Sequence, residues 1–192
     1  MRLPLPALDG RHQAANAGLA LTLLNRMPGF AAADDHLTRA LTEAEWPARM
    51  QRLTSGPWRA FLPRDAELLL DGGHNPSAAQ AMAESLVADG KRPLQLVFAM
   101  LRSKDPEAFL RAFIPLKPQV WTVPVTGETP AFTPEELAAV AASCGLQAQP
   151  MNDVPQALKA IPRRNGHGPC VLICGTLYLA GAVLSANGPL PR

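Results

Sequence analysis

The stretch Glu67-Leu-Leu-Leu-Asp71-Gly-Gly-His74-Asn-Pro76 decides the fold. Its run of leucines has the length and composition of a short β-strand buried on both faces. The two glycines permit a tight turn, and Pro76 suits the first turn of a helix, where its missing N–H would have had no partner. Apolar residues then recur at helical spacing. The stretch therefore predicts a strand at 67–70, a turn, and a helix at 76–88.

The rest of the chain repeats this order of strand and helix. Further strands are predicted at 94–100, 120–125, 147–149 and 170–174, and further helices at 106–113, 134–144, 154–161 and 177–184. Strands that alternate with helices across short loops indicate βαβ units. The predicted fold is therefore an α/β domain with a mostly parallel sheet and helices on both faces.

The region before this domain follows a different pattern. Helices are predicted at 14–27 and 37–41, and two short strands at 50–53 and 58–62, joined around Ser55-Gly56-Pro57. The first helix is mostly apolar and needs partners on nearly every side, but the nearby chain offers few. We therefore expect the chain to begin partway through a larger structure, with a boundary between residues 45 and 46.

The composition of the chain argues against several classes of function. The 192 residues are 47% hydrophobic and carry a net charge of +2 without a dense basic run, which gives little support to nucleic-acid or membrane-surface binding. No segment reaches the roughly 18 to 20 apolar residues of a membrane span. Neither common glycine-rich phosphate loop occurs. Three cysteines without a signal peptide indicate a reduced, cytoplasmic protein.

No metal site is predicted. Cys170 and Cys174 flank a run of β-branched and leucine residues. A zinc site needs four ligands, so buried packing explains these cysteines better than metal binding.

Polar side chains follow three of the predicted strands. They are Asp71 and His74, Lys104 and Asp105, and Thr176 and Tyr178. The carboxyl ends of parallel strands form the edge at which open α/β sheets bind ligands, and helix starts there favour anions. Each group has a structural alternative, since Asp and His often complete turns and Asp105 can cap a helix. Their convergence on one edge favours a ligand site.

Several motifs together resemble a known family. Leu70-Asp-Gly-Gly-His-Asn-Pro76 resembles the D-G-A-H-N-P motif of folylpolyglutamate synthase and the bifunctional dihydrofolate synthase, members of the Mur ligase superfamily. Residues 7–17 are similar to the family's G-x-H-Q-x-x-N-A helix, 46–51 to its W-P-G-R-x-Q hinge, 98–105 to its A-M-L-x-D-K-D segment, and 175–181 to its G-S-L-Y-L-A-G ending. The motifs occur in family order across essentially the whole chain.

The resemblance implies two domains. Residues 1–45 would be the C-terminal remnant of a P-loop ATPase domain, and residues 46–192 the complete Rossmann-like C-terminal, or glutamate ligase, domain. ATP and Mg²⁺ would be held mainly by the upstream ATPase domain, which would be the partner of this chain. The chain alone should therefore be inactive, and we expect a monomer.

The resemblance also implies a reaction, in which ATP activates a folate or dihydropteroate carboxylate as an acyl phosphate that the amine of L-glutamate attacks. On the nucleotide side, Asn16 would contact the adenine or ribose and Arg49 the phosphates. Asp71 would help to hold the nucleotide and could position the amine. Ala48 replaces the hinge glycine, so the hinge geometry must differ if that position needs a positive φ.

On the glutamate side, the resemblance places His74 near the acyl phosphate and the glutamate. Thr176, where the family usually has Ser, would bind a glutamate carboxylate with Tyr178 nearby, and Lys104 is a further candidate. Two alternatives stay open. One is another Mur-type ligase that joins an amino acid to a different carboxylate, and the other is a non-catalytic α/β module that binds a nucleotide or an amino acid.

Overall fold

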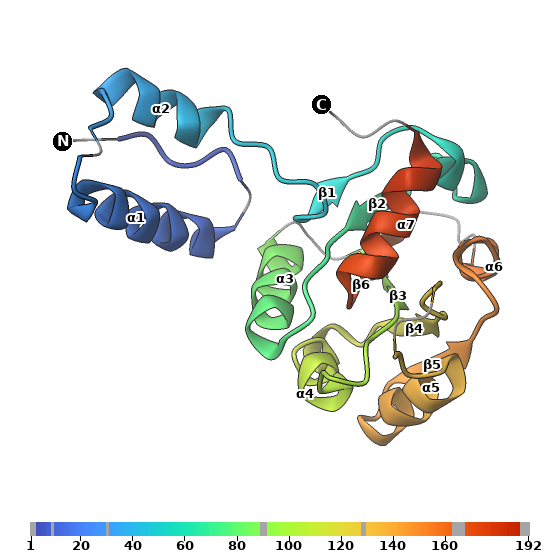
Figure 1. The fold of residues 1–192 in the computed structure, drawn as a ribbon. Helices are drawn as coiled ribbons and strands as arrows, with labels where there is room; N and C mark the ends of the chain where they lie inside the picture. Colours follow the sequence, from blue (N-terminus) through green and yellow to red (C-terminus); the bar gives the residue numbers. More distant parts are fainter. Residues whose placement is uncertain are drawn as a thin grey trace. The chain divides into compact units, whose positions relative to one another are not determined.

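The computed structural model describes residues 3–8, 10–29, 31–88, 92–127, 130–162 and 168–188 (Figure 1). The chain divides into two compact units, Met1–Arg49 and Met50–Arg192. This division falls close to the boundary expected from the sequence. The assignment of the first unit to an ATPase domain stays a prediction.

The first unit contains two helices, α1 (Arg11–Arg26) and α2 (Asp34–Thr42), at the positions of the two predicted helices. The N–H of Ala7 donates to the carbonyl of Leu41 (2.8 Å) and ties the leading segment to α2. Leu19 and Leu23 on α1, and Met27 at its C-cap, are 62%, 58% and 52% exposed. These residues recur at intervals of four, so α1 carries an apolar stripe that the described residues leave uncovered.

The second unit is built on a six-stranded sheet in the order β1-β2-β6-β3-β4-β5 (Figure 1). Its strands are β1 (Gln51–Arg52), β2 (Glu67–Leu70), β3 (Leu94–Phe98), β4 (Gln119–Thr122), β5 (Gln147–Pro150) and β6 (Cys170–Cys174). All neighbours pair in parallel except β1, which runs antiparallel to β2. The prediction of a mostly parallel sheet is therefore confirmed.

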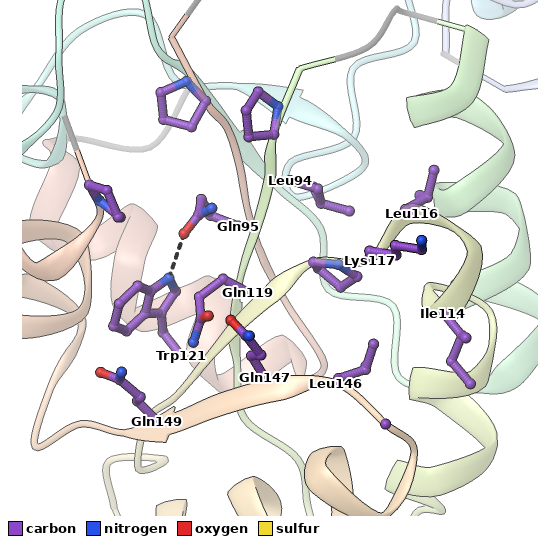
Figure 2. Close-up of a pocket in the computed structure, with 15 residues that line it drawn as sticks. Leu94, Gln95, Ile114, Leu116, Lys117, Gln119, Trp121, Leu146, Gln147 and Gln149 are labelled. Carbon is purple, nitrogen blue, oxygen red and sulfur yellow. Dashed lines mark hydrogen bonds between the residues drawn. The ribbon is translucent and has the colours of Figure 1, made fainter. Parts of the chain in front are cut away.

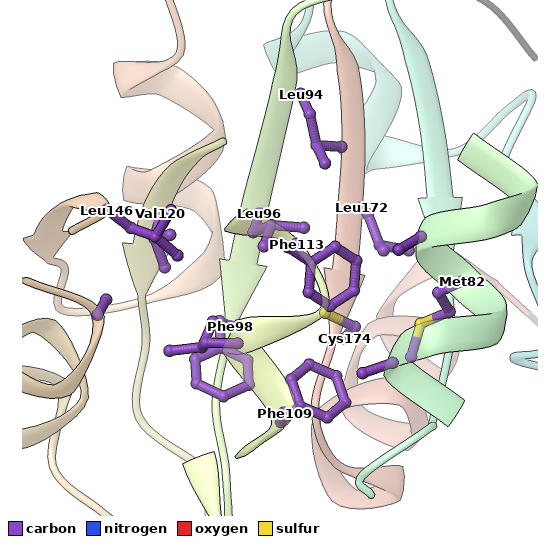
Figure 3. Packing of buried hydrophobic residues seen from close by; sticks show 14 of the residues in the cluster. Met82, Leu94, Leu96, Phe98, Phe109, Phe113, Val120, Leu146, Leu172 and Cys174 are labelled. Carbon is purple, nitrogen blue, oxygen red and sulfur yellow. The ribbon is translucent and has the colours of Figure 1, made fainter. Parts of the chain in front are cut away.

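Helices cover both faces of this sheet. They are α3 (Pro76–Ala88), α4 (Pro106–Arg111), α5 (Pro134–Ser143), α6 (Val154–Ala160) and α7 (Leu177–Asn187). The main core cluster joins α3, α4 and α5 to alternate strand residues such as Leu96, Phe98 and Leu172 (Figure 3). Successive strand residues point to opposite faces, and α6 and α7 pack against β3 and β6 outside that cluster. Among the described helices, none has the length and apolarity needed to cross a bilayer.

The aromatic side chains of the main cluster are fully buried. The rings of Phe98 and Phe109 stack with centroids 5.4 Å apart, and Phe113 lies beside Phe109 at 5.6 Å. Each such side chain contributes about 2 to 3 kcal/mol when it is removed from water. This packing fixes β3 against α4, and thereby the start of α4 at the carboxyl edge of the sheet.

One predicted strand is wrong. Residues 58–62 do not form a strand, because Pro57–Phe61 is a 3-10 helix, η1, preceded by Gly56 at φ 92°. The indole Nε1 of Trp58 donates to the carbonyl of Val183 in α7 (2.8 Å), and Trp58 is buried. Tertiary packing against α7 therefore overrides the strand propensity of the aromatic residues. Smaller differences are that β3 and β4 end at Phe98 and Thr122, before the predicted ends, and that α7 extends to Asn187.

Candidate functional site

The carboxyl ends of β2, β6 and β3 lie next to one another, because β6 is inserted between the other two strands. Hydrogen bonds continue beyond the strands, since Asp71 N–H donates to Ile173 O (2.9 Å) and Ala99 N–H donates to Cys174 O (3.3 Å). The segments that begin at Asp71, Ala99 and Gly175 thus meet at one edge. The three strand ends therefore lie at one edge, as the sequence predicted, and the convergence of their polar side chains on one ligand site stays a prediction.

Asp71 is bound on both carboxylate oxygens. Its Oδ1 accepts from Gly73 N–H (2.7 Å), and its Oδ2 accepts from Met50 N–H (2.9 Å). The side chain is 5% exposed. The carboxylate therefore fixes both the turn after β2 and the backbone before β1, which is the turn-completing alternative considered for this residue.

The backbone before β1 contains two residues in the left-handed region, Ala48 (φ 56°) and Met50 (φ 42°). This conformation costs a non-glycine residue about 1 kcal/mol or more. Ala48 therefore adopts the positive φ that a glycine would take more easily. The Asp71–Met50 bond stabilises one of these two strained residues.

His74 follows the same turn and is half-buried. Its Nδ1 lies 3.1 Å from the carbonyl oxygen of Gly72. A carbonyl only accepts, so Nδ1 carries the hydrogen in this contact, and Nε2 of the neutral ring is then an acceptor. The next residue, Asn75, was not identified from the sequence as a cap, although its Oδ1 accepts from Ala78 N–H (2.8 Å) at the start of α3. An asparagine directly before Pro76 was the available signal.

Thr176 caps α7 and is 2% exposed. Its Oγ1 accepts from Tyr178 N–H (3.2 Å), which leaves its O–H free to donate elsewhere. Gly175 before it has φ 105°, and a Cβ there would overlap the carbonyl oxygen of Ala99. Tyr178 is 54% exposed and Leu177 59% exposed, so the start of α7 presents one buried hydroxyl beside two accessible side chains.

Of the two candidate residues after β3, Lys104 and Asp105, one has a structural role. Asp105 Oδ1 accepts from Ala108 N–H (3.0 Å) and caps α4, so the cap alternative is confirmed for Asp105. Lys104 is exposed. The Asp105 carboxylate thus binds the backbone of α4, and Lys104 is the residue of the pair whose charged group is available to a ligand.

Cys174 ends β6 beneath this edge and is 1% exposed. Burial raises the pKa of its thiol well above the ordinary value, and the charge of Asp71 raises it further. The thiol is therefore protonated and unreactive at neutral pH. Within the described ranges, no group of three or more His, Cys, Asp and Glu residues is arranged to hold a metal ion.

Asn16 and Arg49 belong to the first unit and are both exposed. Asn16 Nδ2 donates to Gln13 Oε1 (3.3 Å) one turn earlier on α1. The side chain of His12, which is part of the same motif, lies outside the described residues. The structure therefore places these two candidates in a different unit from the strand-edge residues.

A large hollow lies at the opposite edge of the sheet. It has a volume of about 660 Å³ and is lined by residues at the amino ends of β3, β4 and β5 (Figure 2). None of the predicted site residues lines it. The carboxyl edge and this hollow are therefore separate features of the second unit.

A mostly parallel sheet whose carboxyl edge carries a tight acidic turn and capped helix starts is typical of an α/β ligand-binding domain. The family described as "Dihydrofolate synthetase, C-terminal domain" matches residues 58–186. The match covers more than half of the chain, and the chain therefore belongs to this family, within the Mur ligases.

Known proteins agree with this assignment. The dihydrofolate synthetase of Saccharomyces cerevisiae is 26% identical over 189 residues, which cover 92% of this chain and 44% of the yeast protein. A folylpolyglutamate synthase of Mycobacterium tuberculosis solved with ADP is 26% identical with a TM-score of 0.79, over 99% of this chain and 42% of that chain. The resemblance inferred from the motifs is confirmed.

A third protein shows the fold alone, at 23% identity. It is a bifunctional folylpolyglutamate synthase/dihydrofolate synthase solved with Mn, AMPPNP and L-glutamate, and it matches with a TM-score of 0.72 over 96% of this chain and 41% of that chain. This chain thus spans less than half the length of all three proteins.

Proposed function

We propose that this chain is the C-terminal part of an ATP-dependent ligase that adds L-glutamate to folate or dihydropteroate through an acyl phosphate. The observation that carries the proposal is the buried hydroxyl of Thr176 at the start of α7, on the same strand edge as the Asp71 turn, in a chain of this family. A hydroxyl donor and the N–H groups of a helix start together suit a carboxylate.

In this proposal the two carboxyl-edge segments have different roles. Thr176 binds a glutamate carboxylate through its O–H, and Tyr178 lies beside it at the start of α7. His74 presents Nε2 as an acceptor because its Nδ1 is bound to Gly72 O. When the glutamate amine attacks the acyl carbon, a C–N bond forms, phosphate leaves with the electrons of the C–O bond, and the amine loses a proton. His74 Nε2 is the proposed acceptor of that proton.

In this proposal, Asp71 mainly holds the backbone of the site in place. Both of its oxygens bind backbone N–H groups, and one of these bonds fixes the turn that leads to His74. A contact between Asp71 and the nucleotide, implied by the family resemblance, is part of the proposal.

ATP and Mg²⁺ are proposed to be held mainly by an upstream P-loop domain. Among the described residues, Arg49 has no hydrogen bond or ion pair to its guanidinium, which suits it to a phosphate. Asn16 would contact the adenine or ribose, and Lys104 is a further candidate for a charged group of the substrates. The exposed stripe on α1 supports contact with the upstream domain. We further propose a monomeric, cytoplasmic protein.

The proposal is tested by titrating the chain with L-glutamate while recording the backbone amide NMR signals. We expect saturable shifts at residues 175–178, and weaker binding in Thr176→Val, which keeps the shape but removes the hydroxyl. Shifts absent from this segment would contradict the glutamate site. The chain alone should show no ATP-dependent glutamate addition, and turnover by it would contradict the role of the upstream domain.

A second assay separates the folate ligases from other Mur-type ligases. The segment joined to a P-loop domain is given dihydropteroate, tetrahydrofolate or a cell-wall nucleotide precursor. Preference for either pterin substrate supports the proposal, and preference for the nucleotide precursor contradicts it. Glutamate binding without any turnover would favour the non-catalytic module.

A further inference from the structure

The hollow at the amino edge of the sheet is lined by four glutamines, one lysine and a set of apolar side chains (Figure 2). Gln95, Gln119 and Gln147 are partners in register on β3, β4 and β5. Because neighbouring residues in register point to the same face of a sheet, their amides form a row across three strands. Trp121 and Gln149 are the next pair in register on the same face.

This face is accessible over β5, whereas over β4 it is partly covered, since Trp121 is buried. Val120 and Ala148, which alternate with the glutamines, belong to or pack against the core cluster with Leu137 and Ala141 of α5. Helix α5 therefore covers the opposite face of these two strands. Gln147 and Gln149 are exposed, and Gln119 is half-buried.

The amide of Gln95 has a defined orientation. The indole Nε1 of Trp121 donates to Gln95 Oε1 (2.9 Å), and both residues are buried at 4% and 8% exposure. An indole N–H only donates, so the oxygen of Gln95 must face Trp121 and its NH₂ must face away. No described residue accepts a hydrogen bond from this NH₂. A side chain that is more than nine-tenths buried thus directs unused donors into the hollow.

The charge of the lining is positive. Of the described residues that line the hollow, Lys117 is the only one with a titratable side chain, and none is a carboxylate. The carboxyl end of α5 reaches this edge at Gly145 and Leu146, and a helix end carries about half a negative charge. The N–H groups of Gly145 and Leu146 bond to Ala142 O and Ala141 O and satisfy part of that end. The full positive charge of Lys117 therefore outweighs the partial charge of the helix end.

We propose that this hollow binds a small carboxylate that also carries a carbonyl acceptor, separately from the strand-carboxyl edge. The carboxylate pairs with Lys117 and the carbonyl accepts from the NH₂ of Gln95. The other glutamines supply donors and acceptors around the ligand. A volume of about 660 Å³ accommodates a molecule of this size.

The test uses 4-acetamidobutanoate, which carries a carboxylate and an amide carbonyl, and its neutral analogue 4-acetamidobutanamide. The Nε1–H signal of Trp121 is the reporter, because that group bonds directly to Gln95. We expect a saturable shift of this signal with the carboxylate and binding weaker by about tenfold with the neutral analogue. Equal affinity for both probes, or a shift that does not saturate, overturns the proposal.

Matched variants assign the binding. Lys117→Gln should weaken binding of the carboxylate by about tenfold and leave binding of the neutral analogue unchanged. Lys159→Gln, a change of the same kind at an exposed lysine outside the hollow, should change neither. Gln95→Met should abolish binding, with retained far-UV circular dichroism as the folding check. Undiminished carboxylate binding in Lys117→Gln contradicts the proposal. The proposed glutamate site fails separately, because its shifts occur at residues 175–178.

Discussion

The two edges of the sheet use polar side chains in opposite ways. At the carboxyl edge, Asp71, Asn75, Asp105 and Thr176 each accept a hydrogen bond from a nearby backbone N–H. At the amino edge, Gln95 keeps two donors without a partner among the described residues, beside a hollow of about 660 Å³. These four residues at the carboxyl edge are therefore engaged by the local backbone, whereas at the amino edge Gln95 presents donors that no described residue accepts.

The difference shows what the motif residues do in this chain. Short polar residues at strand ends first determine the backbone conformation, which sets where His74, Thr176 and the helix starts lie. Groups that are already occupied bind a ligand through their remaining lone pairs or protons. A site of this kind depends on groups brought by another domain or by the substrates, in agreement with the proposed function.

The largest expected effect is at Gly175, where the carboxyl edge is most tightly packed. Gly175→Ala places a Cβ against Ala99 O and 2.7 Å from the Phe98 ring, at φ 105°. Backbone strain and overpacking together should lower the free energy of unfolding by about 4 kcal/mol, measured by urea denaturation. Gly181→Ala is the control, since it lies in α7 with nothing within 4 Å. It should gain up to about 1 kcal/mol. Equal effects in the two variants would contradict the packing argument.

Asp71→Ala should have the next largest effect. The substitution leaves Met50 N–H and Gly73 N–H without their charged acceptor in a buried position. We expect a loss of about 3 kcal/mol in the free energy of unfolding. Asp105→Ala removes a single exposed cap and should lose about 1 kcal/mol. A loss in Asp71→Ala no larger than that of Asp105→Ala would show that Asp71 does not act through the backbone.

The sequence predicted the regular elements well and the long-range partners poorly. Strand β2, helix α3 and strand β6 have the predicted limits, because apolar runs and Gly or Pro residues mark their ends locally. The Met50–Asp71 bond joins residues 21 apart, and the glutamine row arises from the register of three strands. No local pattern encodes such pairs. The strand predicted at 58–62 was wrong for the same reason, since the hydrogen-bond partner of Trp58, Val183, is 125 residues away.

The pH dependence of stability tests the buried thiol of Cys174, which lies beneath the carboxyl edge. The pKa of Cys174 is raised by burial and by Asp71, so the folded protein retains a proton that the unfolded chain releases. The contribution of the Cys174 thiol to the free energy of unfolding is fully present below the pKa of the unfolded thiol, about 8.5. This contribution is lost as the pH rises through the folded pKa. Between pH 9 and 10, this group should lower the free energy of unfolding by up to about 1.4 kcal/mol per pH unit.

Urea denaturation at several pH values measures this slope. Cys174→Ala should remove it, whereas Cys144→Ala, at a half-buried position outside the edge, should keep it. An unchanged slope in Cys174→Ala would assign the pH dependence to other groups.

The smallest expected effect is at Ala48, in the backbone segment before β1. Ala48→Gly relieves a left-handed alanine at φ 56°, which is worth about 1 kcal/mol or more. Loss of the buried methyl group offsets about 0.8 kcal/mol of this gain. Glycine also raises the entropy of the unfolded chain, which further reduces the gain. A net gain below about 0.5 kcal/mol is therefore expected in urea denaturation. Ala157→Gly, in helix α6 and fully buried, loses both its methyl group and helix propensity and should be destabilised instead. Destabilisation of similar size in both variants would mean that the strain at Ala48 is negligible.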